Sequence, residues 1–348
     1  MLPHIDRMAG YIPGEQPRDP AGIIKLNTNE NPYPSSPRVA EAIQTALSDG
    51  RLRRYPDPSG TAFREAVARR HGVSPDMVLA GNGSDDCLTI LTRAFVGPGD
   101  PVAYPTPSYV LYHTLAEIQN ARPVEVPFQP DWTLTPDAFA ATGAPLAFLA
   151  NPNSPSGTML PAAEVAAIAR HFPGTLVVDE AYADFADENC IGLVSELPNV
   201  IVSRTLSKGL SLAGLRIGYL IARPEVIEGL NKVKDSYNCD ALSLLGGAAA
   251  LDDADYTRSI RDRVIATRQR LTEATRALGY AVPESQANFV WCEGGPPAEE
   301  IYEALKAQKI LVRLMRYPGR APGLRVTVGT DEQIDRFLDV LGTILRSR

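Results

Sequence analysis

The chain has 348 residues, of which 44% are hydrophobic and 22% charged, and its formal net charge at pH 7 is −7. This composition is that of a globular protein with a large core and room for more than one domain. The negative charge argues against a nucleic-acid-binding surface, which needs a basic face. Neither an N-terminal apolar signal region nor a run of about 18 apolar residues occurs, so we expect a cytoplasmic protein without a membrane span.

Cysteine and histidine are scattered along the chain. The four cysteines are Cys87, Cys190, Cys239 and Cys292, and no C-x-x-C spacing occurs. The four histidines are equally dispersed. We therefore expect neither a metal site nor a disulfide.

The chain opens with an extended arm. Residues 1–37 are rich in proline, asparagine and glycine, as in "YIPGEQPRDPAG" and "NTNENPYPSSP", which is typical of a segment without packed helices or strands. A helix is then predicted from Pro37 to Leu47, because Val39, Ile43 and Leu47 recur at helical spacing.

Residues 38–240 are predicted to form a large α/β domain. Short apolar runs such as "MVLAG", "LAFLANP", "TLVVDEAY", "NVIVSRT" and "RIGYLIA" alternate with helical segments. "SDDCLTILTRAF" is expected to be a helix capped by Ser84, and Pro161–Phe172 a helix with an early proline. Continuously apolar strands that alternate with helices indicate a largely parallel sheet covered on both faces.

Residues 241–348 are predicted to form a smaller α+β domain. A long charged helix from Tyr256 to Leu278 is followed by "ANFVWC", a helix near Ile301–Gln308, "ILVRL", "GLRVTVG" and a last helix from Asp331. This order of elements indicates a two-layer unit distinct from the preceding sheet.

Four polar segments follow predicted strands of the large domain: "GNGSDD", "NPNSPSG", "DEAY" and "SRTLSK". Ligands of open α/β sheets bind beyond the carboxyl ends of the strands, so these segments are expected to meet in one crevice. Taken singly, each has an ordinary explanation. Asp179 is also a plausible helix N-cap, Lys208 a surface lysine and Arg216 an ion-pair partner.

Taken together, these residues fit pyridoxal phosphate. Lys208 is the amine that condenses with an aldehyde, and Asp179 is the carboxylate that keeps a ring nitrogen protonated. Tyr182 and Asn153 are candidates to hydrogen-bond the phenolic oxygen. The candidates to hold the phosphate are Ser84 with its neighbouring N–H groups, Thr205, Ser207 and Arg216.

Along nearly its whole length the sequence resembles the fold-type I aminotransferases, and within them the histidinol-phosphate aminotransferase group. The motifs are "YIPGE", "LNTNENPYPSSP", "RRYPDPSG", "GNGSDD", "PTPSYVLY", "NPNSPSG", "VVDEAYADF", "RTLSKGLSLAGLRIGY" and "LRVTVGT". The resemblance implies a large domain with a mostly parallel sheet between helices, a smaller α+β domain and an extended N-terminal arm.

The resemblance also implies roles for single residues. Lys208 is similar to the lysine that binds the cofactor covalently and moves the substrate proton, and Asp179 to the partner of the ring nitrogen. Tyr182 and Asn153 are similar to the residues on the phenolic oxygen, with Asn151 not excluded, and Tyr109 to the ring stacked on the cofactor. Residues similar to the phosphate-binding cup are Ser84, Asp85, Thr205, Ser207 and Arg216.

Other matches concern the substrate and a second subunit. Tyr55 of "RRYPD" resembles a tyrosine that reaches the phosphate across a dimer interface, which implies a homodimer. Arg325 is similar to an arginine that binds a substrate carboxylate, and Arg313 to a second substrate arginine. Tyr11 and Asn29 lie in the arm that is expected to cover the substrate.

The chain departs from the family pattern in "NPNSPSG". Threonine usually stands in place of Ser156, and often a second asparagine in place of Ser154. Asn153 is therefore the predicted amide ligand.

The predicted activity is transamination between histidinol phosphate and 2-oxoglutarate in histidine biosynthesis. Two alternatives on the same scaffold are an aromatic (phenylalanine) aminotransferase and a threonine-phosphate decarboxylase. A nucleotide-dependent oxidoreductase is disfavoured because no G-x-G-x-x-G follows a strand. A non-catalytic cofactor-binding protein is disfavoured because the lysine, aspartate, tyrosine and both C-terminal arginines are present.

Overall fold

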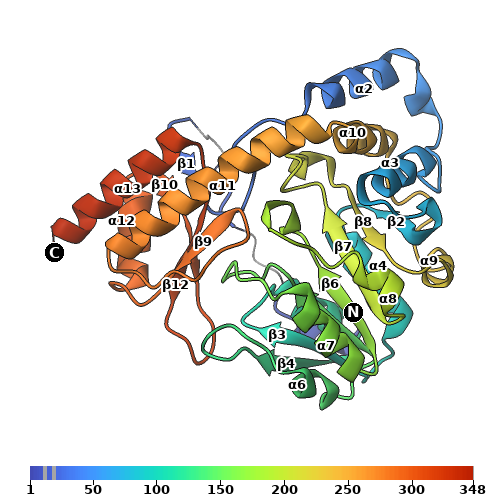
Figure 1. Cartoon of the computed structure of the whole chain (residues 1–348), viewed down its shortest axis with the longest axis horizontal. Helices are drawn as coiled ribbons and strands as arrows, with labels where there is room; N and C mark the ends of the chain where they lie inside the picture. Colours follow the sequence, from blue (N-terminus) through green and yellow to red (C-terminus); the bar gives the residue numbers. More distant parts are fainter. Residues whose placement is uncertain (11–13, 18–20, 348) are drawn as a thin grey trace.

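The computed structural model describes residues 1–10, 14–17 and 21–347 (Figure 1). A seven-stranded sheet between helices makes up the larger part of the molecule, and a three-stranded sheet with long helices makes up the C-terminal part. Within these residues, no helix is both long and apolar enough to cross a membrane.

The large sheet has the strand order β2-β8-β7-β6-β5-β3-β4. All neighbours are parallel except β8, which runs antiparallel to both β2 and β7. The sequence-based prediction of a largely parallel sheet is thereby confirmed, with one reversed strand. The strands are β2 (Val78–Gly81), β3 (Pro101–Thr106), β4 (Arg122–Pro127), β5 (Leu146–Ala150), β6 (Thr175–Asp179), β7 (Val200–Thr205) and β8 (Gly218–Ile221).

Both faces of this sheet are buried, because successive strand residues enter different cores. In β6, Leu176 and Val178 belong to one core and Val177 to the other. The first core includes residues of α3 (Thr61–His71), α6 (Pro136–Ala140), α7 (Ala162–His171), α8 (Leu193–Glu196) and α10 (Ala241–Leu251). The second includes residues of α4 (Ser84–Phe95), α5 (Leu111–Ile118) and α9 (Pro224–Leu230).

The C-terminal unit is built on an antiparallel sheet in the order β11-β12-β9. Its strands are β9 (Phe289–Cys292), β11 (Arg313–Met315) and β12 (Gly323–Thr327), and its helices are α11 (Ala254–Ala277), α12 (Ala298–Ala307) and α13 (Asp331–Arg346). Helix α11 runs across the molecule towards α10 and α2 (Pro37–Ser48) (Figure 1). A separate core, with Phe337 and Leu271 among its members, lies between these helices and the sheet.

The N-terminal segment is tied to the C-terminal unit, and the prediction that it lacks packed helices and strands is wrong. After α1 (Pro3–Arg7), strand β1 (Ile24–Lys25) pairs in parallel with β10 (Ile310–Leu311), and Leu26 lies in the C-terminal core. Helix α10 packs instead against α2 and α3, beside the large sheet. Short 3-10 turns complete the fold at η1 (Arg51–Arg53), η2 (Pro75–Met77), η3 (Ala183–Phe185) and η4 (Ala213–Leu215).

The predicted cap of α4 is also corrected. Ser84 is the first residue of α4 and not its cap. The cap position is Gly83, so no side chain caps this helix. Gly83 has φ +84°, and a Cβ there would lie 2.7 Å from Arg216 Nη2. The position therefore requires glycine both for its backbone conformation and for the approach of the guanidinium group.

Candidate active site

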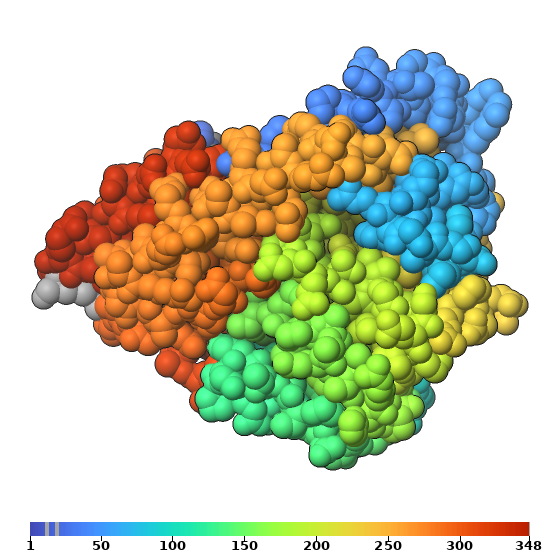
Figure 2. Space-filling model, in the orientation of Figure 1, coloured from blue at the N-terminus to red at the C-terminus, as the bar shows by residue number. Residues whose placement is uncertain are grey.

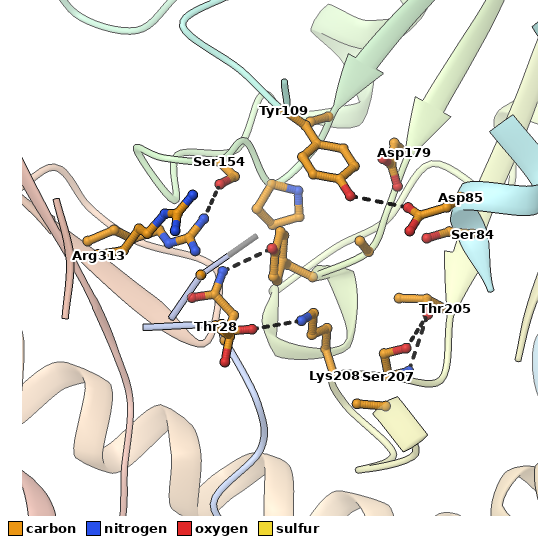
Figure 3. Close-up of a pocket in the computed structure, with 18 of the residues that line it drawn as sticks. Thr28, Ser84, Asp85, Tyr109, Ser154, Asp179, Thr205, Ser207, Lys208 and Arg313 are labelled. Atoms are coloured by element: carbon orange, nitrogen blue, oxygen red, sulfur yellow. Dashed lines mark hydrogen bonds between the residues drawn. The ribbon is translucent and has the colours of Figure 1, made fainter. Parts of the chain in front are cut away.

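A pocket lies at the carboxyl ends of β5, β6 and β7, where the large sheet, the N-terminal segment and the C-terminal unit meet (Figure 3). It brings together most of the residues that the sequence singled out. The predicted residues that line it are Asn29, Ser84, Asp85, Tyr109, Asp179, Tyr182, Thr205, Ser207, Lys208, Arg216, Arg313 and Arg325.

Asp179 ends β6 with a buried carboxylate in the pocket wall. Tyr112 donates a hydrogen bond to its Oδ2 atom at 2.8 Å, whereas Oδ1 has no partner among the described residues. Burial raises the pKa of the Asp179 carboxyl to about 6, and the Tyr112 hydrogen bond opposes that shift. A buried carboxylate oxygen without a donor is costly, so this site fits a ligand with a protonated ring nitrogen.

Lys208 extends from the turn after β7 into the same pocket, where its Nζ donates to the Thr28 carbonyl oxygen at 3.1 Å. Burial, followed by the positive charge of Arg325, lowers the pKa of Lys208 from 10.5 to about 8. A larger fraction of the amine is then neutral near pH 7, which both nucleophilic attack and proton transfer require.

A cup of hydrogen-bond donors lies at the N-terminus of α4. Arg216 Nη1 donates to Ser207 Oγ at 3.2 Å, and Thr205 Oγ1 donates to the same oxygen at 3.0 Å. The first N–H groups of α4, at Ser84 and its neighbours, have no intrahelical acceptor. A helix N-terminus, two hydroxyls and a guanidinium group form a site suited to a phosphate.

Two tyrosines and Asn29 shape the rest of the pocket. Tyr109 donates to Asp85 Oδ1 at 3.2 Å (Figure 3). Asn29 Nδ2 donates to Tyr182 Oη at 3.0 Å, and Thr327 Oγ1 donates to Asn29 Oδ1 at 3.0 Å. The N-terminal segment therefore contacts both the β6 loop and strand β12.

Arg313 and Arg325 are paired neighbours on β11 and β12, and both line the pocket. Arg325 donates to Ser154 Oγ at 2.9 Å and to the Asn27 carbonyl at 3.3 Å, and its guanidinium carbon lies 5.3 Å from the centre of the Phe289 ring. Two adjacent cations at one end of the pocket favour an anionic substrate.

The two asparagines of "NPNSPSG" lie beneath the pocket and do not line it. Asn153 accepts from Ser108 Oγ and donates to the Pro107 carbonyl and Ser156 Oγ. Asn151 exchanges hydrogen bonds with the backbone of Leu160. Ser154, which the prediction passed over, is the residue of this loop whose hydroxyl meets Arg325.

Two further predicted residues are not part of this pocket as described. Tyr55 is 80% exposed and stacks on Tyr237, with ring centroids 4.5 Å apart. Tyr11 lies outside the described residues.

A buried ion-pair network lies behind the pocket. Arg204 Nε donates to Glu180 Oε2 at 2.8 Å, and its Nη1 donates to Asp184 Oδ1 at 3.1 Å. Only 5% of the Arg204 side chain and 1% of the Glu180 side chain are exposed. Because Glu180 follows Asp179 and Arg204 lies four residues before Lys208, the network joins the two loops that carry the pocket's carboxylate and amine. A Cβ at Gly209 would lie 2.3 Å from Asp184 Oδ2, so the lysine turn packs directly on this network.

Three contacts were not anticipated from the sequence. Thr28 acts through its backbone carbonyl, which residue type does not reveal. Asn31 donates to the Lys208 carbonyl at 3.0 Å from a segment 177 residues away. Tyr112 could have been noticed in the sequence, because it lies three residues after Tyr109 in the motif "PTPSYVLY".

Comparison with known proteins identifies the family. The family described as aminotransferase class I and II matches residues 21–341. The chain belongs to this family.

This aminotransferase has relatives that match along nearly its whole length. It is 48% identical to a histidinol-phosphate aminotransferase of Rhodopirellula baltica, over 99% of this chain and 96% of that protein. It is 46% identical to histidinol-phosphate aminotransferase 1 of Trichormus variabilis, over 99% and 98% of the two chains. Among solved structures, the histidinol-phosphate aminotransferase of Sinorhizobium meliloti in complex with pyridoxal-5'-phosphate has a TM-score of 0.90 at 28% identity, and the match covers 100% of this chain and 98% of that one.

Proposed function

We propose that this aminotransferase uses pyridoxal phosphate to transfer an amino group between histidinol phosphate and 2-oxoglutarate. The observation that carries the proposal is its 48% identity, over 99% of the chain, to a protein named for that activity. The pocket supports it with an amine, a carboxylate, an anion cup and two arginines in one place.

The pocket residues fit the cofactor. The unpartnered Oδ1 of Asp179 would accept from the ring nitrogen, and the added positive charge would hold the pKa of this carboxyl below its value in the free protein. The phosphate would be held by the α4 N-terminus, Thr205, Ser207 and Arg216. Tyr109 would stack on the ring, and Tyr182 would hydrogen-bond its phenolic oxygen. When bound, the cofactor supplies an electron-withdrawing ring that stabilises negative charge on the substrate carbon that bears the amine.

Lys208 is proposed to hold the cofactor and to move a proton. Its amine, neutral at a lower pH than an ordinary lysine, takes the proton from the amine-bearing carbon of the substrate. The arm closes over this amine through Thr28 and limits the access of water. Since both substrates use one pocket in turn, ping-pong kinetics are expected.

The rate at which the cofactor-free protein captures pyridoxal phosphate should depend on pH. Only the neutral amine attacks, so the rate is expected to rise with pH, to be half-maximal near pH 8 and to level off above it. Stopped-flow absorbance measures this rate. Arg325→Met should move the midpoint upward, because the charge of Arg325 lowers the pKa of Lys208. A midpoint near the ordinary lysine value of 10.5 would contradict the assignment.

Arg313 is proposed to bind the substrate phosphate. We expect Arg313→Gln to raise KM for histidinol phosphate by about 10- to 100-fold, because a charge-assisted hydrogen bond is lost. KM for glutamate should change much less. Steady-state kinetics with both donors test this. The control is Arg316→Gln, because Arg316 follows β11, pairs with Glu299 and does not line the pocket. Equal effects on both donors would count against a phosphate-specific role.

The overall proposal is tested with three amino compounds assayed side by side: histidinol phosphate, phenylalanine and threonine phosphate. Conversion of the bound cofactor to its amine form, followed by absorbance, is expected to be fastest with histidinol phosphate. A preference for phenylalanine would make the enzyme an aromatic aminotransferase. Release of carbon dioxide from threonine phosphate would make it a decarboxylase.

A homodimer is part of this proposal. Four large hydrophobic side chains are exposed: Tyr55 at 80%, Tyr237 at 48%, Leu47 at 54% and Leu52 at 53%. The segment with α2 and η1 protrudes from the body of the molecule (Figure 2). Several exposed apolar side chains on one protruding region favour a protein partner, and a second copy would bring Tyr55 towards the phosphate cup.

Leu52→Asp should disrupt the dimer, because it places a charge in a contact that excludes water. Sedimentation velocity is expected to show a dimer for the wild type and a monomer for the variant. Leu2→Asp, at another exposed leucine, should leave the dimer unchanged. A wild-type monomer would rule out the shared site.

A further inference from the structure

Asp85 places a negative charge in a cup suited to an anion. Its Oδ2 lies 3.5 Å from Arg216 Nη2, and about half of each side chain is exposed, at 47% for Asp85 and 48% for Arg216. A carboxylate can only accept hydrogen bonds, as a phosphate does, so the two anions compete for the same guanidinium group. The carboxylate therefore does not act as a phosphate ligand.

The turn does not need Asp85 for its own stability. Its neighbour Asp86 makes the local contacts: Asp86 Oδ2 accepts from the Asn82 backbone N–H at 2.9 Å and from Asn238 Nδ2 at 3.0 Å. The Asp85 carboxylate instead faces the pocket, beside the first turn of α4, where a negative charge is favourable. It occupies the position in which a bound anion would be stabilised.

The other oxygen of Asp85 contacts Tyr109. Tyr109 donates to Asp85 Oδ1 at 3.2 Å, and its ring lies edge-to-face against Tyr112, with centroids 5.6 Å apart. Tyr112 in turn donates to Asp179. One carboxylate thus connects the guanidinium group of the cup to the tyrosine that faces the ring site. Figure 3 shows its hydrogen bond with Tyr109.

We propose that Asp85 is a positioning residue that takes the place of the cofactor's phosphate beside Arg216 in the cofactor-free protein and holds the Tyr109 ring over the cofactor site. This inference rests on the proposed function for the assignment of the pocket. A phosphate that enters the cup displaces the carboxylate from Arg216 and leaves its hydrogen bond with Tyr109 in place. The cost of this displacement limits the affinity of the cup for free anions.

Binding of inorganic phosphate to the full-length, cofactor-free protein tests the first part. Asp85→Asn should bind phosphate about 2- to 10-fold more tightly than the wild type by titration calorimetry, because the competing charge is removed. A residue with only a structural role would weaken binding when replaced. Asp252→Asn is the matched control: it removes one carboxylate, 45% exposed and 3.0 Å from Arg69, away from the pocket, and should leave phosphate affinity unchanged.

Binding of pyridoxal phosphate tests the second part. Asp85→Ala and Tyr109→Phe each remove the hydrogen bond and should lower the affinity for pyridoxal phosphate relative to phosphate by about 2- to 5-fold. Asp85→Asn keeps an acceptor for Tyr109, so the affinity for pyridoxal phosphate relative to phosphate should stay as in the wild type. In the double variant Asp85→Ala/Tyr109→Phe the two losses of affinity should not add, because both substitutions remove the same hydrogen bond.

A failure of this inference can be distinguished from a failure of the proposed function. Phosphate affinity that is unchanged or lower in Asp85→Asn, or additive losses in the double variant, would overturn the inference alone. A wild-type protein that does not bind pyridoxal phosphate would overturn the proposed function as well. Tighter phosphate binding in Asp85→Asn, with a non-additive pair at Asp85 and Tyr109, supports the inference.

Discussion

Lys208→Ala is expected to lower the turnover of transamination by about 10⁴-fold or more, because both covalent attachment and proton transfer depend on this amine. Among the described residues that line the pocket, Lys208 is the lysine; its amine donates to the Thr28 carbonyl, and its pKa is lowered to about 8. Steady-state assays with histidinol phosphate measure the loss. Borohydride treatment followed by peptide mass mapping should find the cofactor attached to Lys208 in the wild type.

The control for this variant is Lys306→Ala, which removes a lysine that pairs with Glu15 on the surface. It should retain normal turnover. Circular dichroism of Lys208→Ala should match that of the wild type, because the side-chain amine makes one hydrogen bond and no ion pair among the described residues, and the backbone contacts of Lys208 are kept. Near-normal turnover in Lys208→Ala would disprove the assignment of the amine and with it the proposed chemistry.

Arg204→Met is expected to lower the free energy of unfolding by about 3–5 kcal/mol, because removal of one partner leaves buried carboxylates without their cation. Glu180 is 1% exposed and Asp184 is 15% exposed, so water cannot fully replace the guanidinium group. Urea denaturation followed by circular dichroism measures the change. Cofactor affinity should also fall, since the network joins the loops that carry Asp179 and Lys208.

Two further variants make this result specific. Arg270→Met removes exposed ion pairs to Asp331 and Asp335 and should cost at most about 1 kcal/mol. The triple variant Arg204→Met/Glu180→Gln/Asp184→Asn, which has no uncompensated charge in the network, should recover part of the lost stability. A loss below about 1 kcal/mol in Arg204→Met would mean that the network does not stabilise the two loops.

Much of the fold could be predicted from the sequence because its signals are local. The apolar strands and the capped, periodic helices follow from residue spacing, and α2 at Pro37–Ser48 and α7 at Ala162–His171 lie close to their predicted ranges. The reversed direction of β8 could not be predicted in this way. A continuously apolar run such as "RIGYLIA" is compatible with either direction when both faces of the strand are buried.

The candidate site was also only partly predictable from the sequence. Side chains at the carboxyl ends of strands, such as Asp179 and Lys208, could be placed because the sheet brings those ends together. Asn153 and Ser154 could not be distinguished, since the path of their loop decides which of them faces the pocket. The carbonyl of Thr28 was also beyond prediction, because a backbone acceptor has no residue signature.

The pairing of β1 with β10 has a consequence for biosynthesis of the chain. Ile24 pairs with Ile310, and Asn29 is hydrogen-bonded to Thr327, so the start of the chain is fixed by parts made near the end of translation. A ribosome-bound chain that has completed the seven-stranded sheet still lacks the strand that anchors its first residues. In such a nascent chain the segment with Thr28, which contacts the lysine amine in the finished protein, is therefore not yet fixed by the C-terminal unit.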